Sequence, residues 1–210
     1  MVTLKPEETA LVVIDMQNAA YHPEGTLPQS GVEIAPLLET VPRIRQLVEL
    51  CRARGIRDIW TRQLHYPQDA ARAAHRIQHH TLKRKRIAFQ AGTWDAEIVD
   101  ELKPLLTPET HVIDKHKWSA FYGTRLEVLL RILGTKLVLV AGGTTNACVE
   151  STVRDAFMRD YDVVVVRDCV AGVNQEWHEM ALQVWELYVG EVVDLAEIEA
   201  QLGTRQIVSS

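Results

Sequence analysis

Short apolar runs and amphipathic segments alternate along the chain. Six runs rich in aliphatic and β-branched residues are expected to be strands: 10–15, 56–61, 111–114, 137–141, 162–168 and 191–194. Five segments are expected to be helices: 41–55, 94–102, 124–134, 147–160 and 176–188. Because the strands are apolar on both faces and alternate with helices, we expect a parallel sheet that is covered on both sides. The pattern predicts a Rossmann-like, three-layer α/β/α fold with a mostly parallel central sheet.

Local signals predict how two of these helices begin. Thr124, with Glu127 three residues later, has the spacing of a capping box. Asn146 is expected to cap the helix at 147–160. In that helix, the side chains expected to face inward are Val149, Thr152, Val153, Ala156 and Phe157.

The composition fits one globular domain over residues 1–210. With 47% hydrophobic and 24% charged residues, the chain can bury one core, and no linker or internal repeat marks a boundary. The apolar runs are far shorter than the roughly 20 residues that cross a bilayer. The first ten residues lack the apolar segment of a signal peptide. We therefore expect a cytoplasmic protein with no membrane partner.

The charge balance and the cysteines exclude other classes of protein. A formal net charge of −5 argues against nucleic acid as a partner, because phosphate binding needs a concentrated basic surface. The basic stretch 79–86 carries no recognition motif, so a solvated loop or a subunit contact is expected there. The three cysteines do not form a disulfide framework, and Cys51 and Cys169 are expected to be structural.

Three reactive side chains follow predicted strands. Asp15 ends the first, Lys115 follows the third and Cys148 follows the fourth. Taken singly, they are also typical of a turn residue, a solvated cation and a small buried apolar residue. Because ligands bind at the carboxyl ends of parallel strands, their convergence at one edge favours chemistry.

The chemistry that fits this set is acyl transfer from an amide through a thioester. A thiol at a helix N-terminus beside an ammonium is expected to have a pKa below the usual value of about 8.5. Asp15 is then the group that takes the thiol proton and returns one to the leaving amine. The turn GGTT at 142–145 supplies N–H groups for the oxyanion.

Three segments resemble the isochorismatase-like cysteine hydrolases, which include nicotinamidases, N-carbamoylsarcosine amidohydrolases, ureidoacrylate amidohydrolases and biuret hydrolases. They are LVVIDMQN with Asp15, VIDKHKWSAFYGT with Lys115, and LVLVAGGTTNACVESTVRDA with Cys148. The resemblance implies an isochorismatase-like fold and a homo-oligomer, either a dimer or a tetramer. It also implies the catalytic triad Asp15, Lys115 and Cys148, with Lys115 and not Lys117 as the lysine. A cis peptide bond between Gly143 and Thr144, and an oxyanion hole made by the backbone N–H groups of Thr144 and Cys148, are implied as well.

Three differences from members of that family restrict the substrates and cofactors that we expect. Nicotinamidases have a D-x-H metal element after the second strand, where this chain has Gln63 and only His65 remains. His75, His79 and His80 match no compact zinc pattern, so we expect no metal and no cofactor. True isochorismatases lack the cysteine. We therefore expect a small linear carbamoyl or ureido amide as substrate and ammonia as a product.

The substrate contacts are the least specific part of the pattern. Gln63 has the chemistry to bind a urea-like group, and a plain loop amide is the alternative. Trp118, Phe121 and Tyr122 are candidates for a pocket wall, and core packing is the alternative. A metal-dependent nicotinamidase, a vinyl-ether hydrolase and a non-catalytic binding protein of the same fold remain alternative functions. The intact trio of Asp, Lys and Cys argues against the last.

Overall fold

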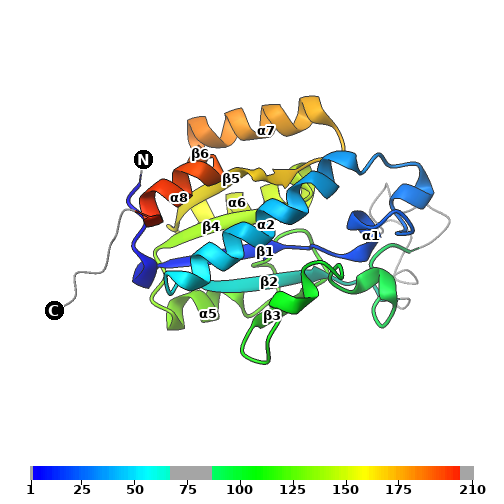
Figure 1. The fold of residues 1–210 in the computed structure, drawn as a ribbon, viewed down its shortest axis with the longest axis horizontal. Helices are drawn as coiled ribbons and strands as arrows, with labels where there is room; N and C mark the ends of the chain where they lie inside the picture. The colour runs from blue at the N-terminus through cyan, green and yellow to red at the C-terminus, as the bar shows by residue number, and fades with distance from the viewer. Residues whose placement is uncertain (1, 67–86, 204–210) are drawn as a thin grey trace.

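The computed structural model describes residues 2–66 and 87–203, which form a six-stranded sheet with helices on both faces (Figure 1). The strand order is β3-β2-β1-β4-β5-β6, and every neighbouring pair is parallel. The strands are β1 (Thr9–Ile14), β2 (Arg57–Gln63), β3 (His111–Lys115), β4 (Leu137–Gly143), β5 (Asp162–Ala171) and β6 (Glu191–Val193). The predicted parallel sheet is confirmed.

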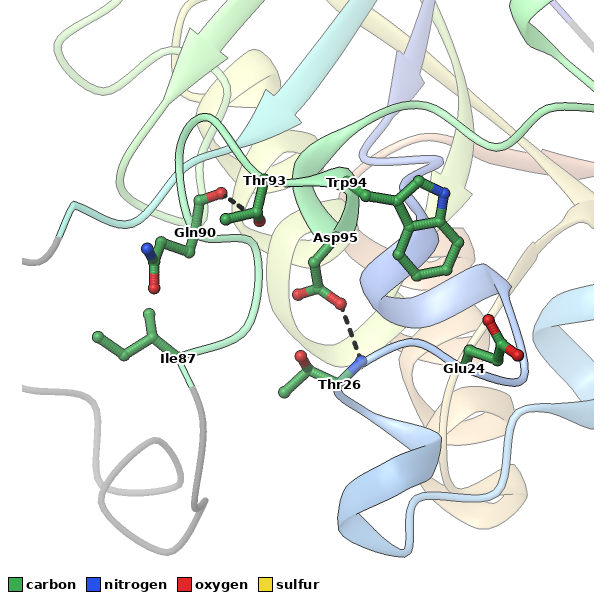
Figure 2. A pocket seen from close by; sticks show the side chains of 7 residues that line it. All are labelled: Glu24, Thr26, Ile87, Gln90, Thr93, Trp94 and Asp95. Carbon is green, nitrogen blue, oxygen red and sulfur yellow. Dashed lines mark hydrogen bonds between the residues drawn. The ribbon is translucent and has the colours of Figure 1, made fainter.

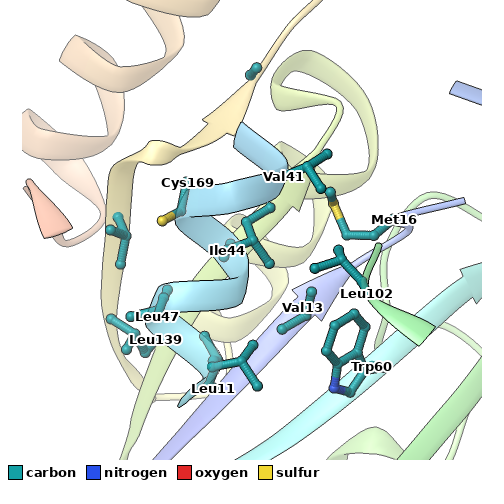
Figure 3. Packing of buried hydrophobic residues seen from close by; sticks show 14 of the residues in the cluster. Leu11, Val13, Met16, Val41, Ile44, Leu47, Trp60, Leu102, Leu139 and Cys169 are labelled. Atoms are coloured by element: carbon teal, nitrogen blue, oxygen red, sulfur yellow. The ribbon is translucent and has the colours of Figure 1, made fainter. Parts of the chain in front are cut away.

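Alternating side chains of the strands build two separate apolar clusters, one on each face. Leu11 and Val13 pack with α2 (Ala35–Ala53) and α8 (Leu195–Gly203), and Figure 3 shows part of this cluster around Trp60. Val12 and Ile14 point the other way, toward the remaining long helices. These are α5 (Leu126–Ile132), α6 (Glu150–Phe157) and α7 (Gln175–Tyr188). The three-layer α/β/α architecture is therefore confirmed.

The remaining short elements lie in the loops. They are α1 (Asn18–Tyr21), the 3₁₀ turns η1 (Pro6–Glu8), η2 (Pro28–Ser30), η4 (Trp94–Ala96) and η5 (Lys103–Leu105), and the π turn η6 (Thr145–Val149). Sequence periodicity missed α8 and placed the start of α2 six residues too late. Among the described residues, no helix has the length and apolar character needed to cross a bilayer.

The prediction of a helix at 94–102 is wrong. The segment instead forms the turn η4, a β-bridge between Ile98 and Gln17 and a turn at 100–102, and η5 follows directly after it. The side-chain amide of Gln17 donates to the carbonyl of Ala96 at 2.8 Å, and that of Asn18 donates to the carbonyl of Trp94 at 2.9 Å. Asn18 also donates its backbone N–H to the carbonyl of Glu97 at 2.9 Å. These carbonyls accept hydrogen bonds from the loop after β1, and the only helical bond among them is that from the Glu97 N–H to the Trp94 carbonyl in η4.

Three further local expectations are corrected. The Thr124 hydroxyl accepts from the backbone N–H of Leu126, two residues on, and Glu127 pairs with Arg131 and Arg159, so no capping box forms. Asn146 caps no helix, because its side-chain amide donates to the carbonyl of Trp177 on α7 at 2.9 Å. The side chain of Phe157, the last residue of α6, is 45% exposed and does not face inward.

Candidate active site

Asp15 and Lys115 meet at the carboxyl edge of the sheet. Asp15 directly follows β1 with a positive φ of 52°, and Thr61 on β2 holds it. The Thr61 hydroxyl donates to Asp15 Oδ1 at 2.7 Å, and the Asp15 N–H donates to the Thr61 carbonyl at 3.2 Å. Lys115 is the last residue of β3 and is in register with Gln63, the last residue of β2. The ends of three adjacent strands therefore carry these side chains.

The Asp15 carboxylate and the Lys115 ammonium form a buried ion pair. Lys115 Nζ lies 2.6 Å from Asp15 Oδ2, and the two side chains are 0% and 3% exposed. The ammonium also donates to Gln63 Oε1 at 2.9 Å and to the Lys117 carbonyl at 3.2 Å. Burial lowers the pKa of Lys115, but the charge of Asp15 and the hydrogen bond to it, with a further contribution from Cys148, outweigh this effect, so the pKa of Lys115 lies above the usual value. Lys115 therefore stays charged at neutral pH, and the exposed Lys117 contributes only its backbone.

The turn that carries Cys148 begins with two glycines in confined space. Gly142 has φ +115°, and a Cβ there would overlap the backbone of Ile14. A Cβ on Gly143 would overlap the Tyr21 hydroxyl. The peptide bond between Gly143 and Thr144 is cis. Gly142 therefore admits no side chain, and a side chain at Gly143 would have to displace the Tyr21 hydroxyl. The chain passes from β4 into η6 with only Thr144 between them.

Hydrogen bonds fix the orientation of this turn. The backbone N–H groups of Ala147 and Val149, the residues on either side of Cys148, donate to the Thr144 carbonyl at 3.1 and 3.3 Å. The Thr152 hydroxyl donates to the Cys148 carbonyl at 2.7 Å and accepts from the N–H of Ala120 at 3.0 Å. Thr152 thus ties the cysteine to the loop that follows Lys115.

The Cys148 thiol lies beside the ion pair, close enough for both Asp15 and Lys115 to influence its pKa. Burial raises its pKa to about 12, and the charge of Lys115 only partly offsets this. The expectation of a lowered thiol pKa is therefore wrong. Its physical reason is burial: Cys148 is 8% exposed and sits in η6, before the first turn of α6. The thiol is neutral at pH 7 and has a carboxylate beside it.

The rate of Cys148 alkylation is expected to report this pKa. In the wild-type protein, the rate with iodoacetamide should keep rising with pH and show no plateau between pH 6 and 9, because the pKa is about 12. Asp15→Asn removes a charge that raises this pKa, so alkylation at pH 8 should become faster. Lys115→Met removes a charge that lowers it, so alkylation should become slower. Peptide mass spectrometry separates Cys148 from Cys51 and Cys169, and a wild-type plateau below pH 7 would contradict the assigned direction.

The four residues predicted to contact the substrate differ in their exposure and in their neighbours. Gln63 is 3% exposed and binds Lys115. Trp118 and Tyr122 are 38% and 59% exposed. Phe121 is buried in the apolar cluster beneath α5 and α6, with the Arg159 guanidinium 4.9 Å from its ring centre. This environment is that of a packing residue.

Sequence patterns missed three residues that hold the site. Gln17 is fully buried and binds both the N–H and the carbonyl of Gln63. Thr61 orients Asp15, and Thr152 orients Cys148. In the sequence, Gln17 lies two residues after Asp15 and Thr152 four residues after Cys148, but Thr61 lies near none of the reactive residues. Gln17 and Thr61 each lie 46 residues from these partners, so no local spacing links them.

Within residues 2–66 and 87–203, no group of three His, Cys, Asp or Glu side chains is placed to hold a metal ion. His65 forms a β-bridge with Gln90 and lies beside the Phe89 ring. The basic stretch 79–86 and the side chains of His75, His79 and His80 lie outside the described residues.

A separate hollow of about 510 Å³ lies among the loops after β1 and β2 (Figure 2). The residues that line it are Glu24, Thr26, Ile87, Gln90, Thr93, Trp94 and Asp95. The Asp95 carboxylate accepts from the backbone N–H groups of Thr26 and Phe89 at 2.9 and 2.8 Å. Asp95 therefore joins two loops, and none of the three reactive side chains lines this hollow.

The chain is similar in sequence to curated proteins that are named ureidoacrylate amidohydrolase. It is 33% identical over 192 residues to the ureidoacrylate amidohydrolase RutB of Agrobacterium fabrum, covering 86% of this chain and 83% of the relative. It is 34% identical over 214 residues to the protein of the same name from Methylobacterium radiotolerans, covering 96% and 82%.

Solved structures share the fold. A cysteine hydrolase from Pseudomonas syringae pv. phaseolicola superimposes with a TM-score of 0.84 at 22% identity, over 97% of this chain and 96% of that one. N-carbamoylsarcosine amidase from Thermoplasma acidophilum has a TM-score of 0.72 at 27% identity, over 96% and 99%. The family profile of the Isochorismatase domain matches residues 9–197. The chain therefore belongs to the isochorismatase domain family.

Proposed function

We propose that this protein is a cysteine-dependent amidohydrolase that cleaves the C–N bond of a small linear carbamoyl or ureido amide and releases ammonia. The observation that carries the proposal is the buried Asp15–Lys115 ion pair, 2.6 Å between charged atoms, against the Cys148 thiol. Relatives named ureidoacrylate amidohydrolase, at 33% and 34% identity, support an amide as the substrate class.

In the first half of the reaction, Cys148 Sγ attacks the carbonyl carbon while its proton passes to the Asp15 carboxylate. This coupling fits a thiol whose burial raises its pKa to about 12, because no free thiolate is needed beforehand. A C–S bond forms and the carbonyl electron pair moves to oxygen. The C–N bond then breaks, Asp15 gives its proton to the nitrogen, and ammonia leaves a thioester on Cys148.

In the second half, water attacks the thioester carbon and passes a proton to Asp15. The C–S bond breaks, the thiolate takes the proton back from Asp15, and the acid product leaves. Lys115 stays protonated throughout, since its pKa is raised, and its charge stabilises both the Asp15 carboxylate and the developing thiolate. The enzyme returns to its starting protonation state after each turnover.

The backbone N–H groups of Thr144 and Cys148 are the proposed oxyanion donors. Thr144 directly precedes η6 and Cys148 lies within it, so both amides belong to the turn that carries the thiol. Amides fixed by a folded turn stabilise negative charge without reorganising during the reaction. This assignment fits a turn that opens with two glycines in confined space, Gly142 against the Ile14 backbone and Gly143 against the Tyr21 hydroxyl.

Ammonia release from a panel of amides tests the proposal. The panel contains a ureidoacrylate, N-carbamoyl amino acids, biuret, maleamate and nicotinamide. We expect turnover of at least one carbamoyl or ureido compound, with the activity lost in Cys148→Ala and kept in Cys51→Ala, a matched change at a buried cysteine on α2. Turnover of nicotinamide alone would favour the nicotinamidase alternative. Activity that survives in Cys148→Ala, or no turnover of any compound, would contradict the proposal.

A further inference from the structure

The side-chain amide of Gln63 has a fixed orientation. Its Oε1 lies 2.9 Å from Lys115 Nζ. An ammonium group only donates hydrogen bonds, so the amide oxygen must face Lys115 and the NH₂ group must point away from it. This Nε2 atom is buried and makes no hydrogen bond among the described residues. Within the described part of the chain, the site therefore contains a buried donor to which no acceptor is bound.

The position of this donor is rigid. Gln17 binds the Gln63 backbone from both sides, accepting from its N–H at 2.8 Å and donating to its carbonyl at 3.0 Å. Gln17 also donates to the carbonyl of Ala96, so a second loop holds it in place. With its backbone and its side-chain oxygen both bound, Gln63 cannot swing its amide to a new partner without breaking these contacts. The contacts of Gln63 with the described residues therefore hold its Nε2 atom in place with no acceptor among them.

The donor also lies next to the reacting groups. The Lys115 ammonium contacts both Gln63 Oε1 and Asp15 Oδ2, and it is close enough to Cys148 for the two groups to shift each other's pKa. Binding of the amide oxygen to a cation polarises the amide, which makes its N–H groups stronger donors. Buried donors without a partner are rare in native proteins and are costly, so an acceptor that arrives with a ligand is the physical explanation.

We propose that Gln63 is a specificity residue whose Nε2 donates to a second carbonyl oxygen of the substrate, beside the carbonyl that Cys148 attacks. The favoured class is then the acylureas and related ureido compounds, in which one nitrogen separates the two carbonyl groups. The proposal rests on the function proposed above. A substrate that lacks the second oxygen would leave Nε2 unpaired and would bind less well.

N-acetylurea and N-ethylurea form a matched pair of probes, because they differ in the second carbonyl oxygen. Their dissociation constants are measured by calorimetry with Cys148→Ala, which binds without turnover, and with Cys148→Ala/Gln63→Glu. The introduced carboxylate keeps an oxygen for Lys115 and replaces the donor with an acceptor. We expect the affinity for N-acetylurea to fall roughly 10–100-fold in the double variant, the effect of one strong hydrogen bond, and that for N-ethylurea to change less than about threefold.

Comparison of the two ligands cancels effects of the added charge that act on both. Equal changes for the two ligands would overturn the proposal, as would a Cys148→Ala protein that binds N-acetylurea no more tightly than N-ethylurea. Thermal unfolding of both variants shows that they are folded. Failure of the proposed function is a different result, because it appears as wild-type protein without Cys148-dependent ammonia release.

Discussion

Asp15→Asn is expected to abolish amide hydrolysis and to lower the free energy of unfolding by about 3–5 kcal/mol. The substitution leaves the Lys115 ammonium, whose side chain is 0% exposed, without its counter-ion. It also removes the group that we propose to move protons between the thiol, the leaving nitrogen and water. Steady-state ammonia release and urea unfolding at pH 7 measure the two effects.

The variant Asp15→Asn/Lys115→Met separates stability from catalysis. It removes both charges, so we expect it to recover most of the lost stability, because a buried ion pair can be replaced by uncharged groups at little cost. It should remain inactive. As a surface control, Asp114→Asn breaks the exposed Arg62–Asp114 pair of 2.7 Å and should change stability by less than about 1 kcal/mol. Turnover by Asp15→Asn would contradict the proposed proton transfer.

Gly143→Ala is expected to reduce kcat by at least roughly 100-fold, the effect of losing one of the two proposed oxyanion donors. The added methyl group would overlap the Tyr21 hydroxyl, so the turn must shift and carry the amide of Thr144 with it. Overpacking of this kind also lowers the free energy of unfolding by about 1–3 kcal/mol. Enzyme kinetics and urea unfolding measure both changes.

Tyr21→Phe provides the matched control for this prediction. It removes only the hydroxyl against which Gly143 packs, so the single variant should retain turnover. In Gly143→Ala/Tyr21→Phe, the methyl group gains the space of the hydroxyl, and we expect part of the lost kcat to return. An active Gly143→Ala protein would show that the turn tolerates a side chain and is not held in the proposed way.

The sheet and the three reactive positions were predictable because they depend on local patterns. Buried strands such as Leu137–Gly143 are continuous apolar runs, and the topology of a parallel sheet brings their carboxyl ends to one edge. Because Asp15, Lys115 and Cys148 each follow a strand, the sequence predicted that they lie close together, and in the structure they do. The cis peptide bond between Gly143 and Thr144 was predicted only from the resemblance to the family, because hydrophobic periodicity carries no information about it.

The errors arose where tertiary contacts override local preference. Segment 94–102 has helical composition, but Gln17 and Asn18 bind the carbonyls that a helix would need. The sequence also placed the Cys148 thiol beside a cation and a helix, yet its pKa is set mainly by burial, which depends on everything packed around it. The roles of Thr61 and Gln17 rest on partners distant in sequence, so no motif marked them.

The most direct test of the account is to trap the covalent intermediate. Wild-type protein is mixed with the substrate that the ammonia panel identifies, quenched with acid within the first turnovers, and analysed by intact-protein and peptide mass spectrometry. The account predicts an added mass equal to the substrate's acyl group, located on the peptide that contains Cys148 and absent from Cys148→Ala. Continued turnover in Cys148→Ala, or an acyl group on another residue, would contradict it.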